Sequence, residues 1–185
     1  PLPTEPLLFI KPGSCVVALD ESFSIPDDRG AVHYEAEIAV LIGKPLSRKP
    51  NAEEVLDAIS GFAPALDLTL RELQDQLKAK SYPWEVAKSF DGACVLAAFV
   101  PGDAVEDLSD IGIRLSLNGE VRQDGNSRDM LNPILPLIQH ICGHFSLQPG
   151  DVILTGTPVG VGPLTSGDRL QLELVGHSSF TTSVL

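Results

Sequence analysis

Residues 32–43, with the sequence VHYEAEIAVLIG, have the apolar composition of a strand but carry two acids near their start. In an extended chain residues i and i+2 point to the same face, so Glu35 and Glu37 share one face, roughly 6.6 Å apart along the strand. The apolar residues that alternate with them share the other face. Two like charges this close repel each other unless a cation lies between them or one carboxyl group stays protonated.

The composition is that of one acidic globular domain. The chain has 185 residues, enough for a single domain over residues 1–185 with a sizeable core, and its net charge is −12, from 25 acidic and 13 basic residues. Nucleic acids and anionic membranes are bound through basic patches, so neither is an expected partner. Bound cations could instead neutralise part of the excess acid.

The cysteines and the hydropathy indicate in which cellular compartment the protein is expected. Cys15, Cys94 and Cys142 are odd in number and far apart, which argues against a disulfide framework or a zinc–thiolate site and suits a reducing compartment. No run approaches the ~18 apolar residues of a membrane helix, and no signal peptide is visible. We therefore expect a cytoplasmic protein. Because the chain opens at Pro1 without a methionine, we also expect it to be a trimmed form of a longer polypeptide.

Two helices are predicted in the first half of the chain. Residues 51–60 (NAEEVLDAIS) combine an Asn cap, early acids and apolar residues at helical spacing. Thr69 and Glu72 have the spacing of a capping box, which predicts a helix from about residue 70 to residue 80. Asp67 is then expected in the turn between a short apolar segment and this helix.

Strand signals dominate the rest of the chain. An Asn118-Gly119 turn between two short runs is a strong hairpin signal. The other expected elements are strands at 15–19, 151–154, 169–175 and 180–185, a helix at 134–145 and a glycine-proline loop at 156–163. Few helices and many strands favour a mixed α+β domain over an alternating β-α-β sheet.

Three carboxylates form the strongest candidate site. Glu35, Glu37 and Asp67, if they converge, are the ligand set expected for a hard divalent cation such as Mg²⁺. The alternative is that the two glutamates face solvent on an edge strand and that Asp67 only caps a helix. Spacing alone does not choose between these interpretations.

Three cationic or amide side chains are candidates for substrate binding. Arg71 and Gln74 lie i, i+3 on the helix after Asp67, where they could hold a carboxylate and a carbonyl beside the metal. The alternative for both is a solvated helix face. Lys88 has small and apolar neighbours, which suits an anion-binding or catalytic lysine, although a snorkelling side chain is the ordinary explanation.

Other motifs exclude functions more than they suggest them. The stretch Thr155-Gly156-Thr157-Pro158 could offer N–H groups and a hydroxyl to an anion, but it is neither a P-loop nor a dinucleotide fingerprint. The chain has no G-x-S-x-G, which counts against a serine hydrolase. His140 and His144 lack the glutamate of H-E-x-x-H and are interpreted as structural.

At this level of detail the chain resembles the fumarylacetoacetate hydrolase superfamily, and most closely its bacterial and mitochondrial domain-containing members. The resemblance covers nearly the whole chain, in the family's order. It rests on six stretches, namely FIKP (9–12), HYEAE (33–37), LDLTLRELQ (66–74), AKSFD (87–91), NGE (118–120) and LTGTPVGVG (154–162).

The resemblance implies a fold, a metal site and a substrate site. The fold is a mixed β-strand pseudo-barrel with a few peripheral helices, usually assembled as a homodimer. The implied ligands of Mg²⁺ or Mn²⁺ are Glu35, Glu37 and Asp67. The residues implied to face a small 2-oxo acid substrate are Arg71, Gln74, Lys88 and Thr157, with Lys88 in a catalytic role.

One departure concerns the start of the chain. Relatives carry, ahead of the position of Pro1, a mobile lid with a His-x-x-Glu pair that is thought to activate the attacking water. This pair is absent from the printed sequence. We expect that the lid was disordered or removed, rather than that the chain lacks the full reaction.

These features predict a reaction class. A 2-oxo acid can chelate Mg²⁺ through its carboxylate and C2 carbonyl, and the cation favours reactions in which negative charge develops on the C2 oxygen. The main expectation is hydrolysis of a C–C bond in acylpyruvate-type 2,4-diketo acids. The alternatives are an oxaloacetate decarboxylase or tautomerase, or an isomerase of aromatic-degradation keto acids. A non-enzymatic alternative is a binding protein stabilised by a cation.

Overall fold

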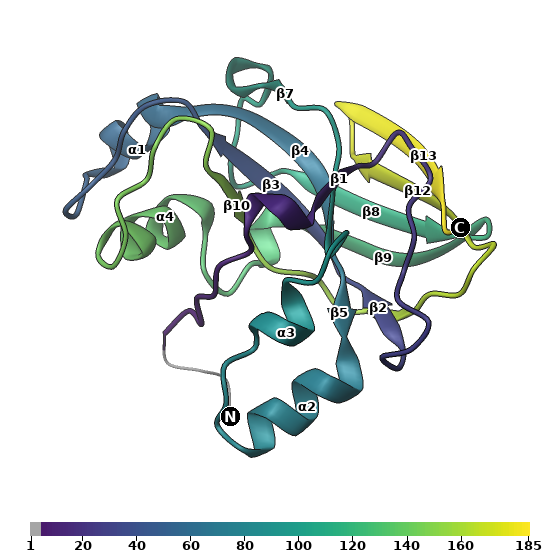
Figure 1. Ribbon diagram of the computed structural model, residues 1–185. Helices are drawn as coiled ribbons and strands as arrows, with labels where there is room; N and C mark the ends of the chain where they lie inside the picture. Colours follow the sequence, from purple (N-terminus) through teal and green to yellow (C-terminus); the bar gives the residue numbers. More distant parts are fainter. Residues whose placement is uncertain (1–4) are drawn as a thin grey trace.

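The computed structural model describes residues 5–185 and has the predicted mixed α+β class. The strands of the described chain form three β-sheets, and each is an open path of strands rather than a closed ring. Four α-helices lie at the periphery, α1 and α4 together on the left of Figure 1 and α2 and α3 below, next to β5.

The central sheet holds the most buried strands. Its order is β1-β6-β4-β3-β10, and β7 also pairs with β4. β3 and β4 are antiparallel and almost wholly buried, so their sequences are apolar on both faces rather than alternating. The strands are β1 (Val16–Ala18), β3 (Ala36–Ile42), β4 (Ile59–Asp67), β6 (Cys94–Leu96), β7 (Val100–Pro101) and β10 (Val152–Leu154).

A four-stranded antiparallel sheet covers the central sheet. Its order is β13-β12-β8-β9, and β3 contacts β8 while β4 contacts β12. Leucines alternate along β12 and point into the core between the sheets. The strands are β8 (Gly112–Leu117), β9 (Glu120–Asn126), β12 (Arg169–Leu174) and β13 (Ser178–Ser183).

The predicted hairpin at Asn118-Gly119 is confirmed. It joins β8 to β9, and both turn residues have positive φ, 53° at Asn118 and 84° at Gly119, the conformation that this dipeptide adopts most readily. A bulge follows in β9. Ser116 pairs with Val121 and Leu115 with Gln123, so Arg122 has no partner of its own.

The predicted strand over residues 32–43 is two strands. β2 (Val32–Tyr34) joins a small sheet with β5 (Thr69–Leu70) and β11 (Gly162–Pro163), and β3 begins at Ala36. Glu35 lies in the break between them.

The helices lie where the sequence predicts them, but some end earlier than predicted. α1 (Ala52–Ala58) has the expected Asn51 cap, but it ends two residues early because β4 begins at Ile59. α4 (Ile134–Cys142) has Gly143 as its C-cap and so ends before the expected residue 145. The remaining helices are α2 (Arg71–Ala79), α3 (Glu85–Lys88) and the short 3-10 turns η1 (Gly13–Cys15), η2 (Gly102–Ala104) and η3 (Ser127–Asp129).

The predicted capping box at the start of α2 is wrong. The N-cap is Leu70, and it has no side-chain cap. Thr69 lies in β5, paired with His33 of β2, so its hydroxyl is not placed to bond the first turn of the helix. That hydroxyl belongs instead to the candidate site described below.

The state of the cysteines and the length of the helices can be compared with the sequence analysis. Cys15, Cys94 and Cys142 are free thiols, and all three are buried. Within residues 5–185 no helix is both long and apolar enough to cross a membrane.

The loop after β10 is seated directly on β9. Gly160 has a φ of +104°, and a Cβ atom there would overlap the backbone carbonyl oxygen of Arg122. Gly125 meets the same loop, since a Cβ at Gly125 would lie 2.7 Å from Cβ of Pro158. Two glycines on opposite sides of this contact therefore allow the backbones to approach closely.

Gly160→Ala and Gly150→Ala form a matched pair that tests this contact. Both glycines have positive φ, but nothing lies within 4 Å of a Cβ built at Gly150. We expect Gly150→Ala to cost about 1–2 kcal/mol of unfolding free energy from backbone strain alone. Gly160→Ala adds an overlap and should cost about 2–4 kcal/mol. Urea unfolding of both variants measures the difference, and equal costs would contradict the proposed crowding.

Candidate active site

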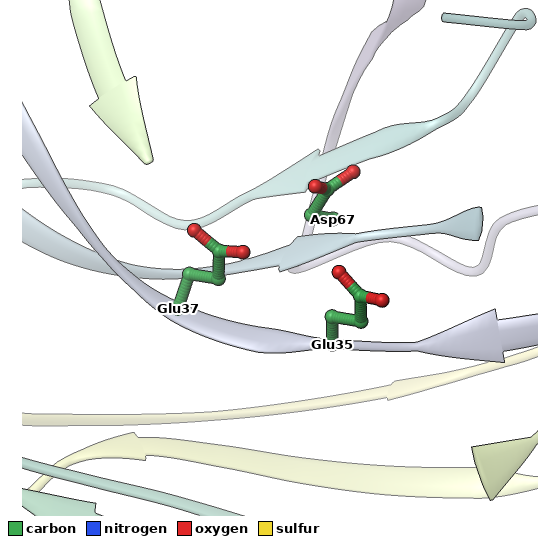
Figure 2. A group of neighbouring side chains, drawn as sticks. All are labelled: Glu35, Glu37 and Asp67. Carbon is green, nitrogen blue, oxygen red and sulfur yellow. The ribbon is translucent and has the colours of Figure 1, made fainter. Parts of the chain in front are cut away.

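Glu35, Glu37 and Asp67 converge in the interior of the protein (Figure 2). One carboxylate oxygen from each lies within 4.8 Å of the others. The three residues are only 8%, 5% and 2% exposed. The interpretation in which the glutamates face solvent on an edge strand is therefore wrong.

Strand pairing brings the third acid to the first two. Ala36 of β3 lies opposite Leu66 of β4, and one position further on the Asp67 N–H donates to the Glu35 carbonyl oxygen at 2.9 Å. Cross-strand neighbours share a face of a sheet, and so do residues i and i+2 of one strand. The spacing predicts that Glu35 and Glu37 share a face, and the β3–β4 register adds Asp67, the last residue of β4.

Lys88 is buried within the cluster. Its Nζ lies 2.6 Å from Asp67 Oδ2 and 2.9 Å from Glu35 Oε2, and it donates to Thr69 Oγ1 at 2.7 Å. The residue is 2% exposed, so the snorkelling explanation is wrong. The Phe9 ring lies 5.2 Å from this ammonium and covers it.

Arg71 and Gln74 also reach the cluster. The Arg71 guanidinium forms an ion pair with Glu35 and donates to Gln74 Oε1 at 2.8 Å, as expected for an i, i+3 pair on α2. Gln74 is buried, whereas the Arg71 side chain is 23% exposed. The alternative that both residues lie on a solvated helix face is therefore wrong for Gln74. Arg71 lies between the acids and solvent.

The glycine-proline loop completes the surroundings. The Gly156 N–H donates to Glu37 Oε2 at 2.6 Å, which fixes the loop beside the acids. Thr157, the next residue, accepts a hydrogen bond from Gln123 Nε2 at 2.8 Å. His140 and His144 stack edge-on at the end of α4.

Lys11 is a site residue that the sequence analysis did not single out. Its Nζ lies 2.8 Å from Asp67 Oδ1, and it donates to the Lys88 backbone carbonyl. Within residues 5–185 this buried oxygen has no hydrogen-bond partner, so its contact with the Lys11 ammonium is an ion pair. The only sequence signal was its place in the FIKP stretch.

The two glutamates have opposite electrostatic environments in the metal-free protein. Burial alone would raise the pKa of Glu35, but the Lys88 ammonium and the Arg71 guanidinium hold that pKa below its ordinary value. Burial and the nearby Asp67 charge raise the pKa of Glu37 to about 8, although the Gly156 N–H opposes them. Lys88 and Arg71 thus neutralise one glutamate, and the other lacks a cation.

This donor set fits a divalent metal ion. Hard cations prefer carboxylate oxygens, and three acids supply them here. Glu37 is buried and has no ion-pair partner among the described residues. A bound cation would supply that partner, so Glu35, Glu37 and Asp67 could hold one.

Comparison with known proteins identifies the family. The model for the family described as Fumarylacetoacetate (FAA) hydrolase C-terminal matches residues 1–185, and the chain belongs to this family. The chain is 49% identical over 185 residues to Oxaloacetate tautomerase YcgM of Escherichia coli, covering 100% of this chain and 84% of that protein. It is 37% identical over 176 residues to a mitochondrial oxaloacetate decarboxylase of Dictyostelium discoideum, covering 95% and 80%.

A solved structure extends the similarity to the fold. Fumarylpyruvate hydrolase from Pseudomonas aeruginosa, in complex with Mn²⁺ and pyruvate, superposes with a TM-score of 0.92 at 29% identity. The match covers 98% of this chain and 80% of that one. The family fold predicted from the sequence is confirmed.

The raised pKa of Glu37 predicts how stability depends on pH without metal. Glu37 keeps its proton to about pH 8 when folded, against an ordinary value of 4.5, so the folded state binds more protons in this range. The stabilisation of the folded state by this bound proton is fully present below about pH 4.5 and is lost as the pH rises through about 8. Urea unfolding in EDTA at several pH values should show this loss, on the order of a few kcal/mol.

Glu37→Gln should flatten that pH profile, because an amide does not titrate. At pH 8.5 without metal this variant should be more stable than the parent, whereas the exposed Glu53→Gln control should follow the parent. Parallel profiles for parent and Glu37→Gln would contradict the buried, protonated glutamate.

Proposed function

We propose that this protein is a metal-dependent enzyme that interconverts the keto and enol forms of oxaloacetate. The observation that carries the proposal is the buried carboxylate triad with the Lys88 ammonium against two of its members. The 49% identical relative named as an oxaloacetate tautomerase supports the choice of substrate and reaction.

The charges of the site suit a dianionic 2-oxo acid. Oxaloacetate carries a carboxylate beside its ketone and a second carboxylate at the far end. Arg71 is partly exposed and is paired with Glu35 and Gln74, so it can turn toward an incoming carboxylate at modest cost. Gln74 then orients the remainder of the molecule, and Thr157 offers a hydroxyl from the opposite loop.

Glu35, Glu37 and Asp67 are proposed to hold Mg²⁺ or Mn²⁺. The complex of the Pseudomonas aeruginosa relative with Mn²⁺ and pyruvate supports a divalent ion and a 2-oxo acid as ligands of this protein. When bound, the ion supplies a Lewis acid for the negative charge that develops on the substrate's C2 oxygen.

Lys88 is the proposed catalytic residue. In enolisation a water molecule takes a proton from C3, the electron pair of that C–H bond forms the C2–C3 double bond, and the C2 oxygen takes the negative charge and then a proton from the resulting hydronium ion. The Lys88 ammonium has three N–H groups and lies within 2.9 Å of Glu35, Asp67 and Thr69, so it can donate to that oxygen by leaving one of them. There it stabilises the charge, because little water is present to screen it. Thr69 holds the ammonium in place through its hydroxyl oxygen.

Two other reactions place charge on the same atom. Decarboxylation moves the electron pair of the C3–C4 bond toward the C2 oxygen, and a relative named as an oxaloacetate decarboxylase supports this second candidate. Hydrolysis of an acylpyruvate, the main expectation from the sequence, is supported by relatives of lower identity such as the fumarylpyruvate hydrolase. The oxaloacetate reactions are therefore the better supported. A homodimer and a cytoplasmic location stay predictions.

One assay set separates these reactions. Loss of enol absorbance follows tautomerisation, and formation of pyruvate follows decarboxylation or acylpyruvate cleavage according to the substrate supplied. We expect enol–keto conversion to be fastest, to stop with EDTA and to return with Mg²⁺ or Mn²⁺. Equal rates after chelation would overturn the metal mechanism. No turnover of any of these substrates with metal bound would instead favour a cation-stabilised binding protein.

Lys88→Met should lower kcat/KM for oxaloacetate at least about 100-fold, because it removes the donor to the C2 oxygen. The change also removes one of the two cations paired with each of Glu35 and Asp67, so Lys88→Arg, which keeps the charge but changes its position, is measured beside it. The exposed Lys80→Met variant is the matched control and should keep parental activity. A folded Lys88→Met variant with parental kcat/KM would remove Lys88 from the reaction.

A further inference from the structure

Gln123 is a buried amide that uses both of its N–H groups and its oxygen. It lies on β9 and is 1% exposed. Its Nε2 donates to Thr157 Oγ1 and to the Pro158 carbonyl, both at 2.8 Å. Its Oε1 accepts from the Ala36 N–H at 2.9 Å.

The chemistry of these partners fixes the orientation of the amide. A backbone N–H can only donate, so the atom facing Ala36 must be the oxygen. A backbone carbonyl can only accept, so the atom facing Pro158 must be the nitrogen. The second hydrogen of that nitrogen then points at Thr157 Oγ1, which acts as an acceptor in this bond.

We infer that Gln123 is a positioning residue that acts on the site through Thr157 and through the backbone between Glu35 and Glu37. This inference rests on the proposed function, in which those residues meet substrate and metal. Gln123 itself is not within hydrogen-bond distance of any of the three acids in the described chain.

The first effect concerns the Thr157 hydroxyl. Because Thr157 Oγ1 accepts a hydrogen bond from Gln123, its own hydrogen is free to point elsewhere. Under the proposed function, in which Thr157 faces the substrate, the hydroxyl is thereby set as a donor to the substrate. A donor suits a carboxylate or an oxygen that gains negative charge, so Gln123 selects for anionic groups at this position.

The second effect concerns one peptide group. The N–H of Ala36 and the carbonyl of Glu35 belong to the same peptide unit, at the break between β2 and β3. Gln123 holds the N–H, and the backbone N–H of Asp67 holds the carbonyl. Both ends of the plane are fixed, which sets how the Glu35 and Glu37 side chains leave the backbone.

Close contacts on both sides of Gln123 support a dedicated arrangement. The loop that carries Thr157 and Pro158 rests on β9 at Gly125 and at the Arg122 carbonyl, where Gly160 approaches. If Gln123 only filled space, an apolar side chain of similar size would serve, without the cost of burying an amide.

A double-mutant cycle on Gln123 and Thr157 tests the first effect. The variants are Gln123→Met, Thr157→Val and the double variant, and the measurement is pyruvate binding to the Mn²⁺-loaded protein by calorimetry. We expect each single variant to weaken binding about tenfold, the worth of one hydrogen bond to a charged group. The double variant should bind about as weakly as Thr157→Val alone, because Gln123 is proposed to affect pyruvate only through the Thr157 hydroxyl, which is already absent. Thr157→Ser, which keeps the hydroxyl, should bind like the parent.

Gln123→Glu separates the second effect from the first. An ionised carboxylate still accepts from the Ala36 N–H but cannot donate to Thr157 or Pro158, so the affinities are measured at rising pH until they no longer change. Gln123→Glu should therefore keep Mn²⁺ affinity within about threefold yet lose pyruvate affinity, whereas Gln123→Met should lose both. Gln139→Met is the matched control. Its amide also donates to a proline carbonyl, that of Pro50 at 2.8 Å, and its loss should alter neither affinity.

The outcomes separate the inference from the proposed function. Additive losses in the cycle, or parental pyruvate affinity in a folded Gln123→Met, would overturn the positioning role. Should Gln123→Met fail to fold, parental pyruvate affinity in Gln123→Glu would overturn it instead. A parent that binds pyruvate but does not tautomerise oxaloacetate overturns the proposed function and leaves the Gln123 result standing. A parent that binds no pyruvate with Mn²⁺ present overturns both.

Discussion

The antiparallel pairing of β3 with β4 is the constraint on which the candidate site depends. The hydrogen bond from the Asp67 N–H to the Glu35 carbonyl extends that pairing by one position past Ala36 and Leu66. It puts an acid from each strand on one face, next to a second acid two residues along. Buried apolar residues on both strands hold the register, because a one-residue slip would exchange the faces of a strand.

Burying three acids together requires compensation, and the fold supplies cations from separate parts of the chain. Lys11 comes from the segment before β1, Arg71 from the start of α2, and Lys88 from the end of α3. They act on Glu35 and Asp67, while Glu37 has only the Gly156 N–H. Each of these two acids is thus paired with two cations, and Glu37 is paired with none in the described part of the chain. This asymmetry favours either a proton or a metal ion there, and so couples metal binding to proton release.

Local features of the fold could be predicted from the sequence, and features that depend on distant contacts could not. The Asn51 cap, the Asn118-Gly119 turn and the shared face of Glu35 and Glu37 each follow from a few neighbouring residues. The role of Thr69 was misjudged because pairing of β5 with β2 overrides the capping signal. Lys11 bonds a carbonyl 77 residues away, and no local pattern indicates such a contact. Family resemblance supplied the convergence of Asp67 with the glutamates that spacing left open.

The bulge at Arg122 makes the site sensitive to chain length as well as to side-chain identity. Residues i and i+2 normally share a face, yet Val121 is exposed and Gln123 is buried, because Arg122 is an extra residue in β9. Gln123 lies opposite the buried Leu115, so removing Arg122 would leave the amide on the same face of the sheet. A bulge also bends its strand and increases the local twist, and this one comes directly before Gln123. Deleting Arg122 would therefore straighten the strand and change the direction in which the amide leaves it, although no residue that meets the acids had been replaced.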